Sequence, residues 1–158
     1  MIVIKFYLTL IITLLSIYIV AEKWVNSVVS AERHSERVLI LKMVLGDCLL
    51  NVFMVYAPHS GKPDEEKEIF WNEVFHLVSC IPQNEMVAFA GDMNGHIGSS
   101  NVGYVGTHGG FRYGSRNADG SRILEFADGL NFSHLQHIVY EAGSQAGNIC
   151  GWASEKYS

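Results

Sequence analysis

An apolar run in the middle of the chain, residues 49–57, restricts the fold more than any other segment, and Pro58 ends it. Both faces of this segment are apolar when it is extended: Val52, Met54 and Tyr56 lie on one face, and Phe53 and Val55 lie on the other. A strand with two apolar faces is typical of a central strand that is covered on both sides. The chain is therefore expected to fold around a sheet that contains this strand.

Strand and helix patterns alternate around this central run. Strands are predicted over 24–31, 38–45, 86–90 and 137–141, with Gly46-Asp47 as a two-residue hairpin between 38–45 and 49–57. A helix is predicted from Pro63, with three acidic residues in its first turn, to near Pro82. A long glycine-rich loop over 95–122 precedes a short helix marked by Ile123, Ala127 and Leu130. This order predicts a mixed α/β fold.

The apolar excess of the composition, 49% apolar against 17% charged, is concentrated in residues 6–21, which carry no charge. Three interpretations are open for this segment. The segment fits a signal peptide that is cleaved near Ala21, or a membrane helix through which the protein would contact a bilayer. Residues 17–21 also fit a buried strand, because β-branched residues dominate there. The sequon at Asn131 matters only if the chain is secreted.

Charge and cysteine content exclude several classes. A net charge of −5 is not typical of a nucleic-acid-binding domain. Three cysteines without a CxxC pair form neither a disulfide framework nor a zinc site, so buried, reduced thiols are expected. No small-molecule cofactor is indicated.

The segment with most chemical content runs from Phe89 to His96. An apolar strand here delivers Asp92 and Asn94 to its C-terminal end, where loops and ligands meet. An aspartate can act as a general base toward water, and an asparagine can orient it or donate to a phosphate oxygen. Taken alone, a Gly-Asp-x-Asn-Gly sequence is more often a simple turn.

Several segments at fixed spacings strengthen the chemical interpretation: residues 55–61, 65–71, 91–98, 106–117 and 120–127. Together they resemble the endonuclease domain of RTE-type non-LTR retrotransposons and the craniofacial development protein 2-like family. Both belong to the endonuclease/exonuclease/phosphatase (DNase I-like) superfamily. The resemblance covers roughly residues 17–142. It divides the chain into an apolar segment 1–16, a partial domain 17–142, and a tail 143–158 that is expected to be unstructured.

The resemblance implies an α/β sandwich of mixed sheets flanked by helices, and a Mg²⁺-dependent phosphodiesterase acting on DNA. Tyr56 matches the tyrosine that contacts the scissile phosphate, and Asp92 matches the aspartate that activates the attacking water. Asn94 matches the asparagine that holds this aspartate and the phosphate in place. Asp92 is also the candidate metal ligand. Arg116, Asn117 and His96 match a loop near the nucleic-acid backbone.

Departures from the family pattern change the expected activity. Several residues that the family uses have no match here: an upstream asparagine, a metal-binding glutamate, a later aspartate and a terminal Asp-His pair. His134 and His137 lie too early in the chain to supply the histidine of that pair. We therefore expect a domain truncated at both ends and inactive as a nuclease, because groups that act as a unit lose most of the rate when several are missing. The alternatives are a non-enzymatic binding protein that keeps the α/β core and a small membrane-tethered or secreted protein.

Overall fold

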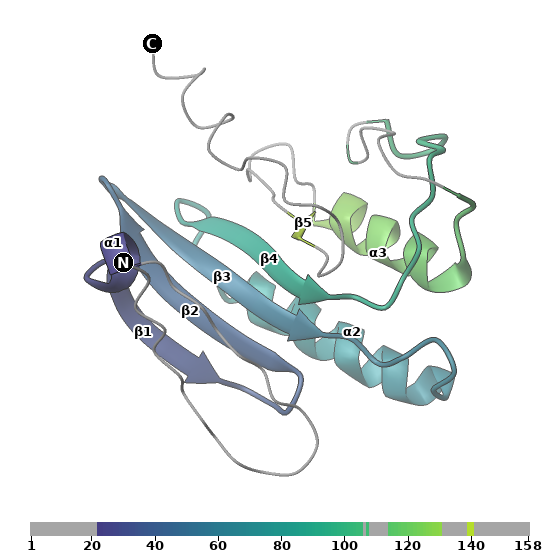
Figure 1. The fold of residues 1–158 in the computed structure, drawn as a ribbon, viewed down its shortest axis with the longest axis horizontal. Helices are drawn as coiled ribbons and strands as arrows, with labels where there is room; N and C mark the ends of the chain where they lie inside the picture. The colour runs from purple at the N-terminus through teal and green to yellow at the C-terminus, as the bar shows by residue number, and fades with distance from the viewer. Residues whose placement is uncertain (1–21, 106, 108–113, 131–138, 141–158) are drawn as a thin grey trace.

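A five-stranded mixed sheet with helices packed against it forms the fold (Figure 1). The computed structural model describes residues 22–105, 107, 114–130 and 139–140. The elements are α1 (Glu22–Val25), β1 (Val28–Arg33), β2 (Val38–Leu45), β3 (Cys48–Tyr56), α2 (Asp64–Ser79), β4 (Met86–Asp92), α3 (Ala118–Gly129) and β5 (Val139–Tyr140). The predicted α/β class is confirmed.

The strands follow one another across the sheet in chain order, β1-β2-β3-β4-β5. The first three are antiparallel, and Gly46, with φ of 60°, makes the predicted hairpin turn between β2 and β3. β3 and β4 are parallel because α2 carries the chain back across the sheet between them. The carboxyl ends of two adjacent strands therefore meet at one edge.

Two predicted boundaries are wrong. The segment predicted as one strand over 24–31 begins instead with the short helix α1, and β1 follows it. The loop predicted over 95–122 is shorter, because α3 starts at Ala118, where the Asn117 side chain caps it. The strand predicted over 137–141 is confirmed at β5, and residues 137, 138 and 141 lie outside the described residues.

The core lies between the sheet and the two long helices. Phe53, on β3, and Val74, on α2, are completely buried, and Phe89 packs on Phe53 with ring centroids 5.2 Å apart. The helix that the apolar spacing predicts from Pro63 buries Phe70, Val74 and Val78. The other face of β3 is only half-buried at Val52, Met54 and Tyr56, so full cover is confirmed for the Phe53 face alone.

A buried polar network joins the amino-terminal side of β4 to β2 and β3. Glu85 accepts hydrogen bonds from the Asn51 amide at 2.8 Å and from Lys42 Nζ, whose ion pair with it is 3.0 Å long. The Asn51 hydrogen bond, followed by that of Lys42, holds the pKa of Glu85 below its usual value, although burial opposes the shift. Ionised Glu85 therefore stabilises the folded state.

The stabilisation by Glu85 should depend on pH with a defined sign. The pKa of Glu85 is lower in the folded chain than the ordinary glutamate pKa of 4.5. The contribution of Glu85 to the free energy of unfolding is therefore complete above pH 4.5 and is lost as the pH falls through the folded-state pKa. Glu85→Gln should cost about 1.5–3 kcal/mol at pH 7, since it removes a charged acceptor of two donors. Urea unfolding of both proteins from pH 7 to pH 3 should show the difference shrinking below pH 4.5.

The exposed carboxylate of Glu65, for which no partner is described, supplies the control for this titration. Glu65→Gln should lower the unfolding free energy at pH 7 by less than about 1 kcal/mol, the usual range for an acidic residue in the first turn of a helix, and so by less than Glu85→Gln. A Glu85→Gln deficit that stayed constant down to pH 3 would contradict the assigned role of the ionised group.

Other predictions meet the structure only in part. Cys48 and Cys80 are free, as expected, but both are exposed rather than buried, because they lie at the ends of β3 and α2. Across the part of the chain that the structure describes, no helix is both long and apolar enough to cross a bilayer. The segment 6–21, Asn131, His134, His137, Cys150 and the tail 143–158 lie outside the described residues.

Candidate functional site

The candidate site forms where β3 and β4 end side by side. Tyr56 and Asp92 are partners in the parallel register, and the Ala57 N–H donates to the Asp92 carbonyl at 2.9 Å, which extends the pairing by one residue. Side chains alternate along a strand, so Tyr56 and Asp92 leave the sheet on the face opposite to Phe53 and Phe89. β3 ends at Tyr56 and β4 at Asp92, close to where the strand patterns predict, and the roles assigned to the two residues stay predictions.

A tight turn after β4 fixes Asn94 next to Asp92. Asn94 has φ of 50°, a left-handed conformation that asparagine tolerates better than most residues. Its N–H donates to Asp92 Oδ1 at 2.8 Å, and its side-chain Nδ2 donates to the Ala57 carbonyl at 2.7 Å. The asparagine thus orients the carboxylate and joins the loop after β4 to the end of β3.

Gly91 allows the two strands to approach one another just before the site. Its φ is 130°, and a Cβ placed on it would lie 1.9 Å from the Val55 carbonyl oxygen. No side chain fits at that distance without displacing β3 or β4. The position of Asp92 therefore depends on a glycine immediately before it.

An open pocket of about 270 Å³ lies beside this turn. It is lined by His59, Ser60, Asp92, Asn94, Gly95, His96 and Asn117. Two loops contribute: the one after β3, and the one after β4, which runs to Asn117 at the start of α3. The sequence predicts four of these residues as site residues and misses His59 and Ser60, whose signal is their position directly after the proline that ends β3.

Asn117 joins the loop after β4 to the start of α3. Its side-chain oxygen accepts the N–H of Gly120 at 2.7 Å and the N–H of His96 at 3.0 Å, and its own N–H donates to the His96 carbonyl. A Cβ on Gly120 would lie 2.0 Å from that carbonyl, so the backbones touch here. The structure thus brings His96 and Asn117 together, with Asn117 acting as a helix cap.

A buried lysine holds the walls of the pocket together. Lys67, on α2 and only 8% exposed, donates from Nζ to the Ser60 carbonyl at 2.9 Å and forms an ion pair with Asp119 at 3.0 Å. Ser60 belongs to one wall and Asp119 to the first turn of α3. Sequence reasoning misses Lys67, because a charge in an acidic helix is typical of a solvated face.

Tyr56 and Arg116 do not line this pocket. Tyr56 faces the Arg37 guanidinium, 6.0 Å from its ring centroid, and accepts from Arg37 Nη1 at its carbonyl. Arg116 donates to the carbonyls of Ile97 and Ser100 and lies over the Tyr104 ring at 4.9 Å. Arg116 therefore braces the loop that follows β4.

Among the described residues that line the pocket, Asp92 supplies the one carboxylate that a magnesium ion could use. Within the described ranges, no three His, Cys, Asp or Glu side chains group in a way that could hold a metal ion. One Asp92 oxygen already accepts the Asn94 N–H. Protein sites for Mg²⁺ rely on hard oxygen ligands; beside Asp92 this pocket offers two imidazoles, which are nitrogen donors, and the neutral oxygens of Ser60 and of two asparagines.

Comparison with known proteins supports the resemblance in the sequence. The chain is 27% identical over 101 residues to "Craniofacial development protein 2" of Bos taurus, covering 64% of this chain and 17% of that protein. It is 26% identical over 108 residues to the protein of the same name from Tragulus javanicus, covering 68% and 18%. No protein-family profile matches the chain. The chain thus spans less than a fifth of the length of the curated relatives it matches.

Proposed function

We propose that the edge formed by β3 and β4 is a phosphodiester-binding site of DNase I-like origin that binds its ligand without hydrolysing it. The observation that carries the proposal is the Asp92–Asn94 turn, which two hydrogen bonds of about 2.7–2.9 Å tie to Ala57 at the end of the neighbouring parallel strand. The partial match to craniofacial development protein 2 over this region agrees with such an origin.

The chemistry of the pocket favours binding over cleavage. Hydrolysis of a phosphodiester at this kind of site needs a metal to neutralise charge and an acid–base pair. The described lining offers one carboxylate beside several hydrogen-bond donors: the imidazoles of His59 and His96, the hydroxyl of Ser60 and the amide of Asn117. Such donors can hydrogen-bond phosphate oxygens, while the Asp92 charge opposes the ligand.

A net charge of −5 is not typical of a nucleic-acid-binding domain, but the acidic residues of this chain are concentrated in α2 and α3. α2 and α3 together carry eight acidic and two basic residues, a net charge of −6, against −5 for the whole chain. The described residues outside these two helices include six acidic and six basic residues, a net charge of zero. The acidic character belongs to the helices rather than to the strand ends, so a phosphate can approach the pocket from the less acidic side.

Asp92→Asn is the decisive substitution. If no metal bridges the carboxylate and the phosphate, removing the negative charge should tighten binding of a fluorescein-labelled DNA duplex about fivefold, since two unit charges 4 Å apart in water interact by about 1 kcal/mol. Fluorescence anisotropy at low salt, in EDTA and then in Mg²⁺, measures the change. A plasmid-nicking assay with Mg²⁺ should show no activity above background.

Asp47→Asn, at an exposed aspartate in the β2–β3 hairpin, provides the matched control and should leave the affinity unchanged. Weaker binding of Asp92→Asn in Mg²⁺ would overturn the metal-free assignment. Nicking by the unmodified chain that disappears in Asp92→Asn would overturn the claim that the site does not hydrolyse its ligand.

A further inference from the structure

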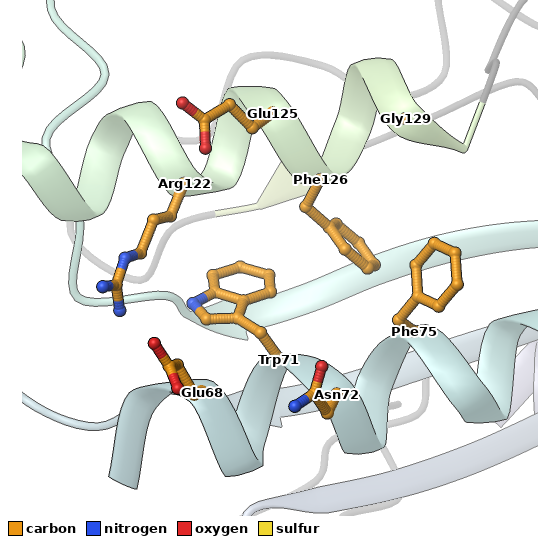
Figure 2. A pocket seen from close by; sticks show the side chains of 8 residues that line it. All are labelled: Glu68, Trp71, Asn72, Phe75, Arg122, Glu125, Phe126 and Gly129. Carbon is orange, nitrogen blue, oxygen red and sulfur yellow. The ribbon is translucent and has the colours of Figure 1, made fainter. Parts of the chain in front are cut away.

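A second hollow, of about 390 Å³, opens between α2 and α3 (Figure 2). It is separate from the 270 Å³ pocket beside Asp92 and Asn94, which we call the phosphate pocket. We call it the helix groove. Its lining residues come from both helices: Glu68, Trp71, Asn72, Phe75, Arg122, Glu125, Phe126 and Gly129. The sequence assigns no chemistry to any of these residues, and none lines the phosphate pocket.

The floor of the helix groove is aromatic and firmly supported. Trp71 packs on Phe126 with ring centroids 5.0 Å apart, and Figure 2 shows both rings lying between the two helices. Trp71 also meets Phe70 edge-on, and Phe126 meets Phe89, so the floor is continuous with the core. Phe75 stands beside them and is 48% exposed. An apolar surface of this kind is a place where a partner can bury area.

The rim of the helix groove is acidic. Glu68 and Glu125 are exposed, and neither forms an ion pair within the part of the chain that the structure describes. The single cation in the lining, Arg122, is bound to Asp64 at 3.3 Å. The lining itself carries two carboxylates and one guanidinium, a net charge of −1, within two helices whose net charge is −6, so the groove favours a cationic over an anionic occupant.

We propose that the helix groove docks a cationic amphipathic helix of a protein partner. The space between two adjacent helices accepts the ridge of a third, with apolar side chains at i, i+3, i+4 and i+7 on the aromatic floor and basic ones against Glu68 and Glu125. The negative charge disfavours nucleic acid and anionic lipid as occupants. A second copy of this face is disfavoured for the same reason, because the two faces carry charge of the same sign.

The test uses a labelled helical peptide with a leucine stripe and a lysine face, and a matched peptide in which every lysine is glutamate. Fluorescence anisotropy on the full chain should show binding of the basic peptide alone. Phe75→Ser and the charge reversal Glu125→Lys should each weaken it about tenfold, since buried aromatic anchors and close charge pairs dominate such contacts.

Two residues of α2 outside the helix groove give matched controls. Ile69, 69% exposed, is the counterpart of Phe75, and the exposed Glu65 is the counterpart of Glu125. Ile69→Ser and Glu65→Lys should keep the affinity within about twofold. Circular dichroism checks each fold, and Glu125→Lys carries the test if Phe75→Ser unfolds.

Three outcomes would overturn the proposal. They are failure of the basic peptide to bind at micromolar concentrations, equal binding of the acidic peptide, and equal losses in the control variants. Binding lost in Glu125→Lys but kept in Asp92→Asn would separate the helix groove from the phosphate pocket.

Discussion

Lys67→Met is expected to lower the free energy of unfolding by about 3–5 kcal/mol, the usual cost of removing one partner from a buried ion pair. Lys67 is 8% exposed, and its ammonium group satisfies both the Asp119 carboxylate and the Ser60 carbonyl. Methionine keeps the length of the side chain but leaves Asp119 as an uncompensated charge. Urea unfolding followed by circular dichroism measures the loss.

The neighbouring pair of Lys62 and Glu66 offers a control on the same helix end. Its N–O distance is 3.5 Å, but the Lys62 side chain is 50% exposed, so Lys62→Met should cost less than about 0.5 kcal/mol. The double variant Lys67→Met with Asp119→Leu should recover much of the loss, because it removes both charges. A Lys67→Met effect no larger than that of Lys62→Met would show that the buried pair does not hold the pocket walls.

Gly91→Ala is the second substitution with a large expected effect. Steric overlap of the new Cβ with the Val55 carbonyl and backbone strain at φ of 130° each cost roughly 1–3 kcal/mol. The strands must separate to admit the methyl group, so the Ala57–Asp92 hydrogen bond should weaken and the amide of Ala57 should exchange faster with solvent. Hydrogen exchange and urea unfolding measure the two consequences.

Glycines elsewhere give graded controls for Gly91→Ala. A Cβ placed on Gly61 would meet nothing within 4 Å, and its φ is ordinary, so Gly61→Ala should be neutral within about 0.5 kcal/mol. Gly46 has equal space but φ of 60°, so its alanine variant should lose about 1 kcal/mol from the backbone alone. If Gly91→Ala were no worse than Gly46→Ala, the close approach of the strands would not limit this position.

Local patterns in the sequence predict the sheet and helices because each pattern has one physical cause. The two apolar faces of 49–57 predict a central strand, and Gly46-Asp47 predicts the hairpin. The acidic first turn after Pro63 predicts α2. The sequence does not predict the start of α3, because an asparagine that caps a helix and an asparagine that lies in a polar loop have the same local pattern.

The sequence predicts only part of the candidate site. Asp92 and Asn94 end or follow β4 and are predicted, whereas His59 and Ser60 follow β3 in the same way and are not. Lys67 is beyond such prediction, because its burial depends on Asp119, 52 residues later in the chain. Contacts of that separation have no signature in a single sequence.

The order of the strands has a consequence for how this protein is made. Each strand lies beside the one that precedes it in the chain, so the sheet can be assembled in the order of synthesis. Once Tyr56 has left the ribosome, β1, β2 and β3 can already form a complete meander. The pocket needs Ser60, Asp92 and Asn117 together, so the growing chain can pair its first three strands well before all the residues that line the pocket have been made.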